Sequence, residues 1–360
     1  MTTQKRIGIL TSGGDCAGLN AVLRSVVHAA TGRGWEVIGI EDGTAGLLDR
    51  PMRYKTLTRE MFDTTIMRLG GTILGTTNKG NPFKLPQPDG TFKDGSDDII
   101  AGIRELGIDT LIGIGGDGSM EILRTLAKRG GFKLIGIPKT MDNDVGKTEV
   151  SVGFETAAYV ATEALDRLQP TAASHDRVMV LEVMGRDAGH VALHAGIAGG
   201  ADVILLPEIP YDIAKVTAKI EQIRADGRQF ALIIVSEAAR PKGGDGMKVE
   251  HTGGEMRYGG VGHYVGAQIS DKTGHETRVT VLGHVTRGAP PIHSDRLIAA
   301  AFGVHAVELV AQGKTERLVA WSNRKVIDVA IDEAIASYQA VDLDGALVKT
   351  ARALGICLGD

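Results

Sequence analysis

Hydrophobic positions alternate between two patterns along most of the chain. Short apolar runs rich in β-branched residues end in Gly-rich turns, and segments with apolar residues at helical spacing follow them. Residues 7–10 are the first such run. The segment after it repeats apolar residues every three or four positions: Leu19, Val22, Leu23, Val26, Val27 and Ala30. This alternation predicts βα units and a largely parallel sheet.

The same unit returns along the rest of the chain. Further predicted strands occupy residues 110–114, 133–137, 178–183, 203–206 and 230–235. Helical spacing recurs in residues 213–223 and at Ile122, Leu123, Leu126 and Ala127. The predicted fold class is therefore α/β, with two Rossmann-like three-layer lobes built on mainly parallel sheets.

Two stretches interrupt this rhythm, residues 78–96 and 241–262. Both are rich in Gly, Pro or Lys, and neither has a clean period, so we expect surface loops there. Long irregular loops in α/β proteins often close over ligands, and a simple insertion explains these stretches equally well.

Length and composition narrow the class of protein. At 360 residues the chain exceeds what one compact core usually holds, which favours two lobes. No apolar run approaches the roughly 20 residues of a membrane helix, and no signal region follows the polar first residues. Two cysteines, Cys16 and Cys357, are too few for a disulfide framework. We expect a cytoplasmic protein with no membrane partner. A formal net charge of -4 also argues against nucleic acid as a partner.

Two Gly-rich turns follow predicted strands, at residues 11–15 (TSGGD) and 115–119 (GGDGS). Successive glycines let backbone N–H groups approach an anion, and the following helix start favours negative charge. A single turn of this kind is more often only a tight turn, but the repetition favours phosphate binding. Neither turn has the spacing of a P-loop or of the dinucleotide-binding fingerprint.

Residues 138–144 (PKTMDND) bring two carboxylates, a hydroxyl and an ammonium together at the end of a strand. A solvated Asx-rich turn is the alternative interpretation. Asp117 weakens that alternative, because it follows another predicted strand of the same sheet. Ligands of parallel sheets collect at the carboxyl ends of the strands. Clustered Asp residues beside phosphate-binding turns fit Mg²⁺ with oxygen ligands and water, which is what phosphoryl transfer requires.

These motifs, with residues 182–186 (EVMGR) and 282–288 (LGHVTRG), resemble in order the motif set of the phosphofructokinase A family. A NAD-kinase-like protein shares the GGDG turn but would lack the later motifs. The resemblance implies the phosphofructokinase fold and transfer of a phosphoryl group from ATP to the C1 hydroxyl of fructose 6-phosphate. It implies a donor lobe of residues 1–153 and 286–336, and a fructose 6-phosphate lobe of residues 154–285 and 337–360.

The resemblance also implies roles for single residues. Asp142 would be the base for the C1 hydroxyl, and Asp117 would bind Mg²⁺ with Asp144 close by. The other catalytic residues would be Thr140, Lys139 and Arg186. The donor would be bound by Gly13, Gly14, Lys79, Gly116, Gly118 and Ser119. The sugar phosphate would contact Thr140, Asp142, Arg177, Met184, Gly185, Arg186, Glu237, Arg278, His284 and Arg287. His284 and Arg287 would grip its 6-phosphate, and an Arg-rich site suits a dianionic phosphate.

The residues that distinguish ATP-using from pyrophosphate-using members of this family are mixed in this chain. Gly118 resembles the ATP-using enzymes, because it leaves room where the pyrophosphate type has an Asp. Lys139 resembles the pyrophosphate-using enzymes, and Lys79 replaces an Arg found in many ATP enzymes. Sterics favour ATP, and a pyrophosphate-dependent enzyme is the alternative.

Two alternatives belong to other classes. One is a non-catalytic sensor of sugar phosphate or nucleotide, which would have no use for Asp142 as a base. The other is a Rossmann dehydrogenase, which lacks its fingerprint here. The resemblance further implies a homodimer or homotetramer in which Arg177 and Arg278 reach the site of a neighbouring subunit.

Overall fold

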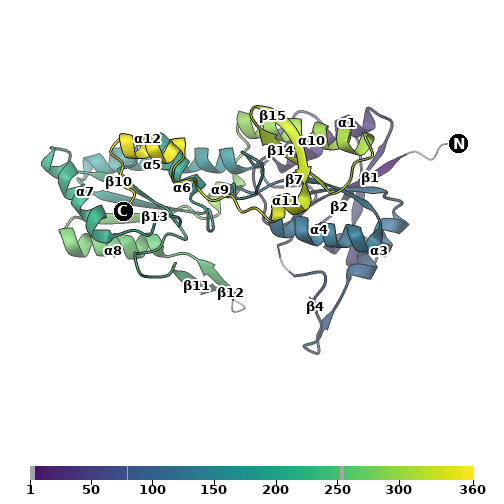
Figure 1. Cartoon of the computed structure of the whole chain (residues 1–360), viewed down its shortest axis with the longest axis horizontal. Coiled ribbons are helices and arrows are strands. Elements are labelled where there is room, and N and C mark those ends of the chain that lie inside the picture. Colours follow the sequence, from purple (N-terminus) through teal and green to yellow (C-terminus); the bar gives the residue numbers. More distant parts are fainter. Residues whose placement is uncertain (1–4, 79, 252–254) are drawn as a thin grey trace. The chain divides into compact units, whose positions relative to one another are not determined.

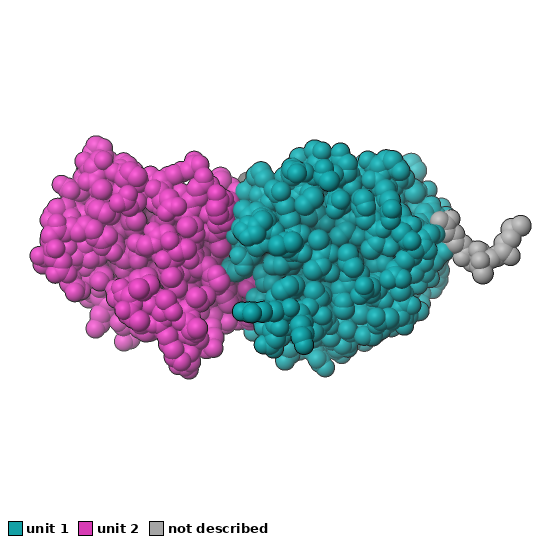
Figure 2. All heavy atoms as spheres, turned by 90° about the horizontal axis from the view of Figure 1, so that it is seen from above, with its two compact units in different colours: residues 1–140, 145–156, 287–338 teal, residues 141–144, 157–286, 339–360 magenta. Residues whose placement is uncertain are grey.

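The structure is a computed structural model that describes residues 5–78, 80–251 and 255–360. The chain forms two compact units, coloured separately in Figure 2. Unit 1 contains residues 1–140, 145–156 and 287–338, and unit 2 contains residues 141–144, 157–286 and 339–360. Each unit has its own sheet, so the predicted α/β class with mainly parallel sheets is confirmed.

Unit 1 is built on a seven-stranded sheet with the order β15-β14-β7-β6-β1-β2-β3. The five inner strands are parallel, and the two edge strands β3 and β15 pair antiparallel. The strands are β1 (Arg6–Thr11), β2 (Glu36–Ile40), β3 (Tyr54–Leu57), β6 (Thr110–Gly115), β7 (Lys133–Pro138), β14 (Arg317–Ser322) and β15 (Lys325–Ala330).

Helices cover both faces of this sheet (Figure 1). Alternate residues of β1, β6 and β7, such as Ile9, Ile112 and Ile135, pack against α1 and α10 on one face. The opposite face packs against α3, α4 and α11 through residues such as Leu111 and Leu134. The helices of unit 1 are α1 (Leu19–Thr31), α2 (Ala45–Leu48), η1 (Glu60–Phe62), η2 (Ile66–Arg68), α3 (Ser96–Glu105), α4 (Asp117–Gly130), α10 (His293–Ala311) and α11 (Ile331–Ile335).

Unit 2 is built on a four-stranded, fully parallel sheet with the order β13-β8-β10-β9. Its strands are β8 (Val178–Val183), β9 (Val203–Leu205), β10 (Ala231–Ser236) and β13 (Thr277–Val281). Apolar side chains of α7 and α8, such as Ile220 and Val265, fill one face together with Val180 and Ile233. The helices are α5 (Phe154–Ser174), which begins in unit 1, α6 (His190–Ala198), α7 (Ile213–Ala225), α8 (Val261–Thr273), α9 (Val285–Gly288), which ends in unit 1, and α12 (Ala346–Ala353).

The two stretches expected to be loops differ from that expectation. Each contains a short antiparallel hairpin: β4 (Leu85–Pro86) with β5 (Phe92–Lys93), and β11 (Lys248–His251) with β12 (Glu255–Tyr258). Phe92 and Met256 are exposed, so these strands bury no regular face. A period of two does not develop in such short, exposed strands, which is why the sequence pattern missed them.

The start of α5 is capped from a distant part of unit 1. Asp295, in the first turn of α10, is fully buried. Its carboxylate accepts hydrogen bonds from the N–H of Gly153 at 2.8 Å and of Thr156 at 2.7 Å, and from the Thr156 hydroxyl at 2.5 Å. The two N–H donors are among the backbone groups that a helix start leaves without intrahelical partners. Burial raises the pKa of Asp295 even though the three donors oppose the shift.

Over the residues that the structure describes, no helix combines the length and the apolar character needed to cross a membrane.

Candidate active site

The first glycine turn and Lys139 come together in unit 1, because β1, β6 and β7 are adjacent parallel strands. Gly13 has a φ of +83°, and a Cβ there would lie 3.2 Å from Ser119 Oγ and 3.4 Å from Lys139 Nζ. The Lys139 ammonium is buried and donates a hydrogen bond to the carbonyl of Gly14. Gly13, Gly14, Ser119 and Lys139 therefore form one cluster of backbone groups and positive charge.

The second glycine turn leads into α4. Gly116 precedes the helix in an extended conformation, and Asp117 is its first residue. Gly118 follows in the first turn, and a Cβ at this position would meet no atom within 4 Å. Ser119 packs close to Gly115, where a Cβ would lie 2.9 Å from its hydroxyl. Gly118 is exposed at this helix start, where N–H groups without intrahelical partners favour an anion.

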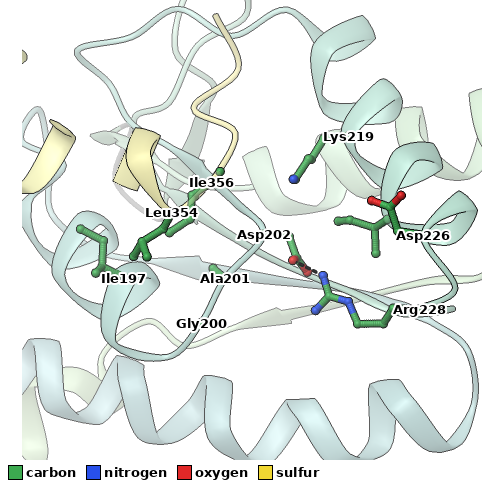
Figure 3. A pocket seen from close by; sticks show the side chains of 11 residues that line it. Ile197, Gly200, Ala201, Asp202, Lys219, Asp226, Arg228, Leu354 and Ile356 are labelled. Carbon is green, nitrogen blue, oxygen red and sulfur yellow. Dashed lines mark hydrogen bonds and ion pairs between the residues drawn. The ribbon is translucent and has the colours of Figure 1, made fainter. Parts of the chain in front are cut away.

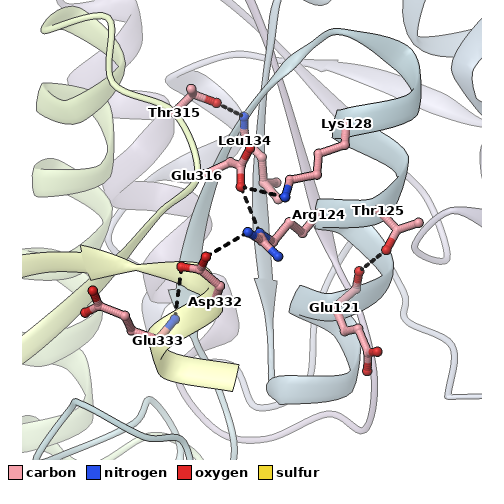
Figure 4. A network of polar contacts seen from close by, with 9 residues as sticks. All are labelled: Glu121, Arg124, Thr125, Lys128, Leu134, Thr315, Glu316, Asp332 and Glu333. Carbon is pink, nitrogen blue, oxygen red and sulfur yellow. Dashed lines mark hydrogen bonds and ion pairs between the residues drawn. The ribbon is translucent and has the colours of Figure 1, made fainter. Parts of the chain in front are cut away.

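A polar network orients α4 within unit 1 (Figure 4). Arg124 Nε lies 2.8 Å from Glu316 Oε2, and Arg124 Nη2 lies 2.9 Å from Asp332 Oδ2 at the start of α11. Lys128 adds a longer contact of 3.6 Å to Glu316. Because Arg124 is two helical turns from Asp117, these pairs restrain the helix that carries the second glycine turn.

Arg287 contacts the first glycine turn. Its Nη1 donates to the carbonyl of Asp15 at 2.8 Å, and a Cβ on Gly14 would lie 2.5 Å from the same nitrogen. The residue belongs to unit 1, whereas His284 belongs to unit 2 and is exposed. A joint grip of these two residues on a 6-phosphate stays a prediction. The position of Arg287 beside Gly14 was not expected from the sequence.

Cys16 follows the same turn, and its thiol is in an environment that makes it unreactive. The thiol is buried and donates to the carbonyl of Val152 at 3.2 Å. Burial raises its pKa to about 12, and the opposing charge of Lys139 does not offset this. A thiol with this pKa stays protonated at neutral pH. Lys79, which was expected at the donor site, lies outside the described residues.

The segment with Asp142 belongs to unit 2, directly after Thr140 at the end of a unit 1 segment. Asp142 and Asn143 are almost fully buried, and Asn143 has a φ of +56°, which Asn tolerates better than most residues. The carbonyl of Asp144 accepts from the N–H of Gln339 at 3.0 Å. The segment is therefore held by backbone contacts, with the Asp142 carboxylate in a nearly water-free position.

Met184, Gly185 and Arg186 form a turn between β8 and α6. Arg186 has a φ of +50°, an uncommon conformation for a residue with a Cβ. Glu237, directly after β10, accepts hydrogen bonds with Oε1 from the N–H of Gly185 at 3.2 Å and of Arg186 at 3.0 Å. Neighbouring strands thus bring three of the predicted sugar-phosphate residues together with Glu237. Its carboxylate supports the backbone of this turn, a contact that the sequence did not predict.

Arg177 directly precedes β8 and Arg278 is the second residue of β13, so both lie at the amino ends of these paired parallel strands and meet at one carboxylate. Arg177 Nη2 lies 2.9 Å from Glu276 Oε1, and Arg278 pairs with the same oxygen. The hydrogen bond from Arg177 is the main cause that lowers the pKa of Glu276. The structure brings these two predicted residues together within unit 2.

Two further contacts at the end of β8 had no counterpart among the predicted residues. The buried carboxylate of Glu182 accepts from the N–H of Gly260 at 3.2 Å and of Gly262 at 2.7 Å, at the start of α8. The hydroxyl of Tyr258 donates to Asp187 at 2.6 Å. Both join residues more than 70 positions apart, so no local signal could reveal them.

Unit 2 also has a pocket with a volume of about 380 Å³, which is lined by other residues (Figure 3). Asp202, Arg228, Lys219 and Asp226 supply its charged groups, and Asp202 pairs with Arg228. Asp202 precedes β9 and Arg228 precedes β10, so the pocket lies at the amino ends of these strands. Glu237 follows the carboxyl end of β10. None of the predicted site residues lines this pocket.

Comparison with known proteins agrees with this geometry. The family described as Phosphofructokinase matches residues 6–310. The chain belongs to the phosphofructokinase family. A Synechocystis protein named ATP-dependent 6-phosphofructokinase 1 is 63% identical over 99% of both chains. A Nostoc protein with the same name is 58% identical over the full length of both.

Solved structures support the same family fold. Phosphofructokinase from Saccharomyces cerevisiae superimposes with a TM-score of 0.79 at 28% identity, over 98% of this chain. The chain spans about half of that yeast chain, 47% of its length. A pyrophosphate-dependent phosphofructokinase from Marinobacter aquaeolei has a TM-score of 0.79 at 21% identity and shares the fold.

Proposed function

We propose that this chain is an ATP-dependent 6-phosphofructokinase, which transfers the γ-phosphoryl group of ATP to the C1 hydroxyl of fructose 6-phosphate. The observation that carries the proposal is the full-length similarity to proteins named ATP-dependent 6-phosphofructokinase. The open space at Gly118 supports ATP as the donor, because a nucleotide needs room where a side chain would otherwise stand.

On the donor side, the cluster of Gly13, Gly14, Ser119 and Lys139 would bind the polyphosphate, together with Gly116, Gly118 and Lys79. Backbone N–H groups and a buried ammonium suit negative oxygens. Asp117 would bind Mg²⁺, which spreads the charge of the transferring phosphoryl group. No group of three or more His, Cys, Asp or Glu side chains among the described residues is placed to hold a metal ion by itself. Mg²⁺ usually takes one or two carboxylates and completes its shell with phosphate oxygens and water, so Asp117 would hold it together with the donor.

On the acceptor side, Asp142 would accept the proton of the C1 hydroxyl. Its burial excludes water, which strengthens its interaction with a bound hydroxyl. Thr140, Met184, Gly185, Arg186 and Glu237 would orient the sugar phosphate, and His284 and Arg287 would bind the 6-phosphate. Catalysis would then rest mainly on positioning and charge stabilisation.

The experiment is a coupled assay of fructose 6-phosphate with ATP and with pyrophosphate, side by side. We expect turnover with ATP, and an Asp142→Asn variant that binds fructose 6-phosphate but loses about 10²- to 10⁴-fold in kcat. Asp166→Asn, an exposed change in α5, is the matched control and should retain full activity. Turnover with pyrophosphate alone would overturn the assignment of ATP as the donor. An active Asp142→Asn variant would overturn the assignment of Asp142 as the base.

We also propose a cytoplasmic homodimer or homotetramer in which Arg177 and Arg278 reach a neighbouring subunit's site. Two free thiols suit a reducing compartment. Light scattering during size-exclusion chromatography measures the oligomeric state, and a stable, fully active monomer would contradict it.

A further inference from the structure

The β11–β12 hairpin (Figure 1) contacts the segment that follows Arg186 through one hydrogen bond. Tyr258, the last residue of β12, donates from its hydroxyl to Asp187 Oδ1 at 2.6 Å. Asp187 comes directly after Arg186. Because a phenol is donating to a carboxylate, the bond is charge-assisted, and it raises the pKa of Tyr258 to about 12.

The hairpin holds this tyrosine in place. Tyr258 is the cross-strand partner of Lys248, whose ammonium lies 5.1 Å from the centre of the phenol ring. A Cβ on Gly246 would lie 3.1 Å from the ring, so the backbone of Gly246 packs closely against it. The ring is therefore seated by its own hairpin, and the hydroxyl is presented from a restrained position.

The base of the hairpin is anchored to the sheet that carries the Arg186 turn. The buried carboxylate of Glu182, near the end of β8, holds the N–H groups of Gly260 and Gly262 just beyond Tyr258. The Arg186 turn leaves the same strand two residues after Glu182. The hairpin and the turn thus share one rigid support.

Arg186 needs such support because its φ of +50° is unfavourable for a residue with a Cβ. Glu237 holds the N–H groups of Gly185 and Arg186 on one side. The bond from Tyr258 restrains Asp187 on the other side. The residues on both sides of Arg186 in the sequence are therefore held in place, Gly185 by Glu237 and Asp187 by Tyr258.

We propose that Tyr258 and Asp187 are a positioning pair that sets Arg186 for the anionic sugar phosphate, so that the hairpin is a working part of the acceptor site. The identity of the ligand rests on the function proposed above. The pair itself touches no substrate in this proposal; it acts through the backbone of residues 185–187.

The test compares Tyr258→Phe with the wild-type chain in the ATP and fructose 6-phosphate assay. The phenylalanine keeps the ring packing and removes only the hydroxyl. We expect kcat/KM for fructose 6-phosphate to fall about tenfold, the magnitude of losing a hydrogen bond to a charged group, while the KM for ATP changes less than twofold. Tyr264→Phe, a change on exposed α8 surface, is the control and should leave both parameters unchanged.

Asp187→Ala should reproduce the loss, and Asp187→Asn, which keeps an acceptor oxygen, should restore part of the activity. The double variant Tyr258→Phe/Asp187→Ala should be no worse than either single change, because the pair acts as one unit. Additive losses, or equal effects on both substrates, would overturn the proposal. Inactive wild-type protein would instead refute the proposed function, whereas an active wild type with an unchanged Tyr258→Phe variant refutes this pair alone.

Discussion

The buried carboxylate of Asp295 gives the sharpest stability prediction. The Asp295→Ala change removes the acceptor for two backbone N–H groups and one hydroxyl at the start of α5. An unsatisfied buried donor costs about 1–3 kcal/mol, so three donors would lose several times that amount. Removal of a desolvated carboxylate, whose raised pKa reflects its burial, offsets part of this loss. We expect a net loss of about 3 kcal/mol, and about 2 kcal/mol for Asp295→Asn, which keeps one oxygen acceptor.

The assay is equilibrium unfolding in urea followed by tryptophan fluorescence. The chain has two tryptophans, Trp35 and Trp321, and both lie in unit 1 with Asp295 and the start of α5. The signal therefore reports unfolding of this unit without interference from unit 2, which matters because two units need not unfold in one step.

The matched control is Asp98→Ala in the first turn of α3. Asp98 forms an exposed ion pair with Lys93 at 2.9 Å, and such pairs contribute less than about 1 kcal/mol. If Asp295→Ala lost no more free energy of unfolding than Asp98→Ala, the carboxylate would not be acting as a cap for α5.

Three further predictions concern the donor site and pH. Gly118→Asp should fold normally, because its Cβ enters open space, yet its kcat/KM should fall more for ATP than for pyrophosphate. Gly118→Ala should change the donor preference little, and equal losses with both donors in Gly118→Asp would refute the steric reason. Lys139→Met should raise the Kd for ATP at least about tenfold by removing a buried charge beside the glycine turn, whereas Lys349→Met, at an exposed position of α12, should not. Isothermal titration with ATP measures both, and matched affinities would contradict the role of Lys139. Burial and the nearby His190 lower the pKa of His194 to about 4, so the unfolded chain binds the extra proton between about pH 4 and 6.5 and stability is lost as the pH falls through this range. The wild type should lose about 2 kcal/mol between pH 7 and pH 5 from this residue, measured by denaturant unfolding, and a His194→Gln variant with the same pH dependence would show that other groups cause it.

Much of the fold could be predicted from the sequence. The strands β1, β6, β7, β8 and β10 are buried on both faces, so their sequences are continuous apolar runs that end in turns. The helices between them bury one side, which leaves a helical period in the sequence. The hairpins β4–β5 and β11–β12 were missed because they bury no regular face.

The sequence by itself determined the α/β alternation, the two glycine turns and the motif order that places the chain in its family. Only the tertiary structure decided which distant side chains contact these segments. They are Arg287 beside Gly14, Glu237 at the N–H of Arg186, Asp295 at the start of α5 and Tyr258 at the carboxylate of Asp187. Local runs are visible in a sequence because their period is set by the geometry of one helix or strand. These four contacts join residues from 51 to 272 positions apart, where strand order and sheet packing set the distance and no period along the chain records it.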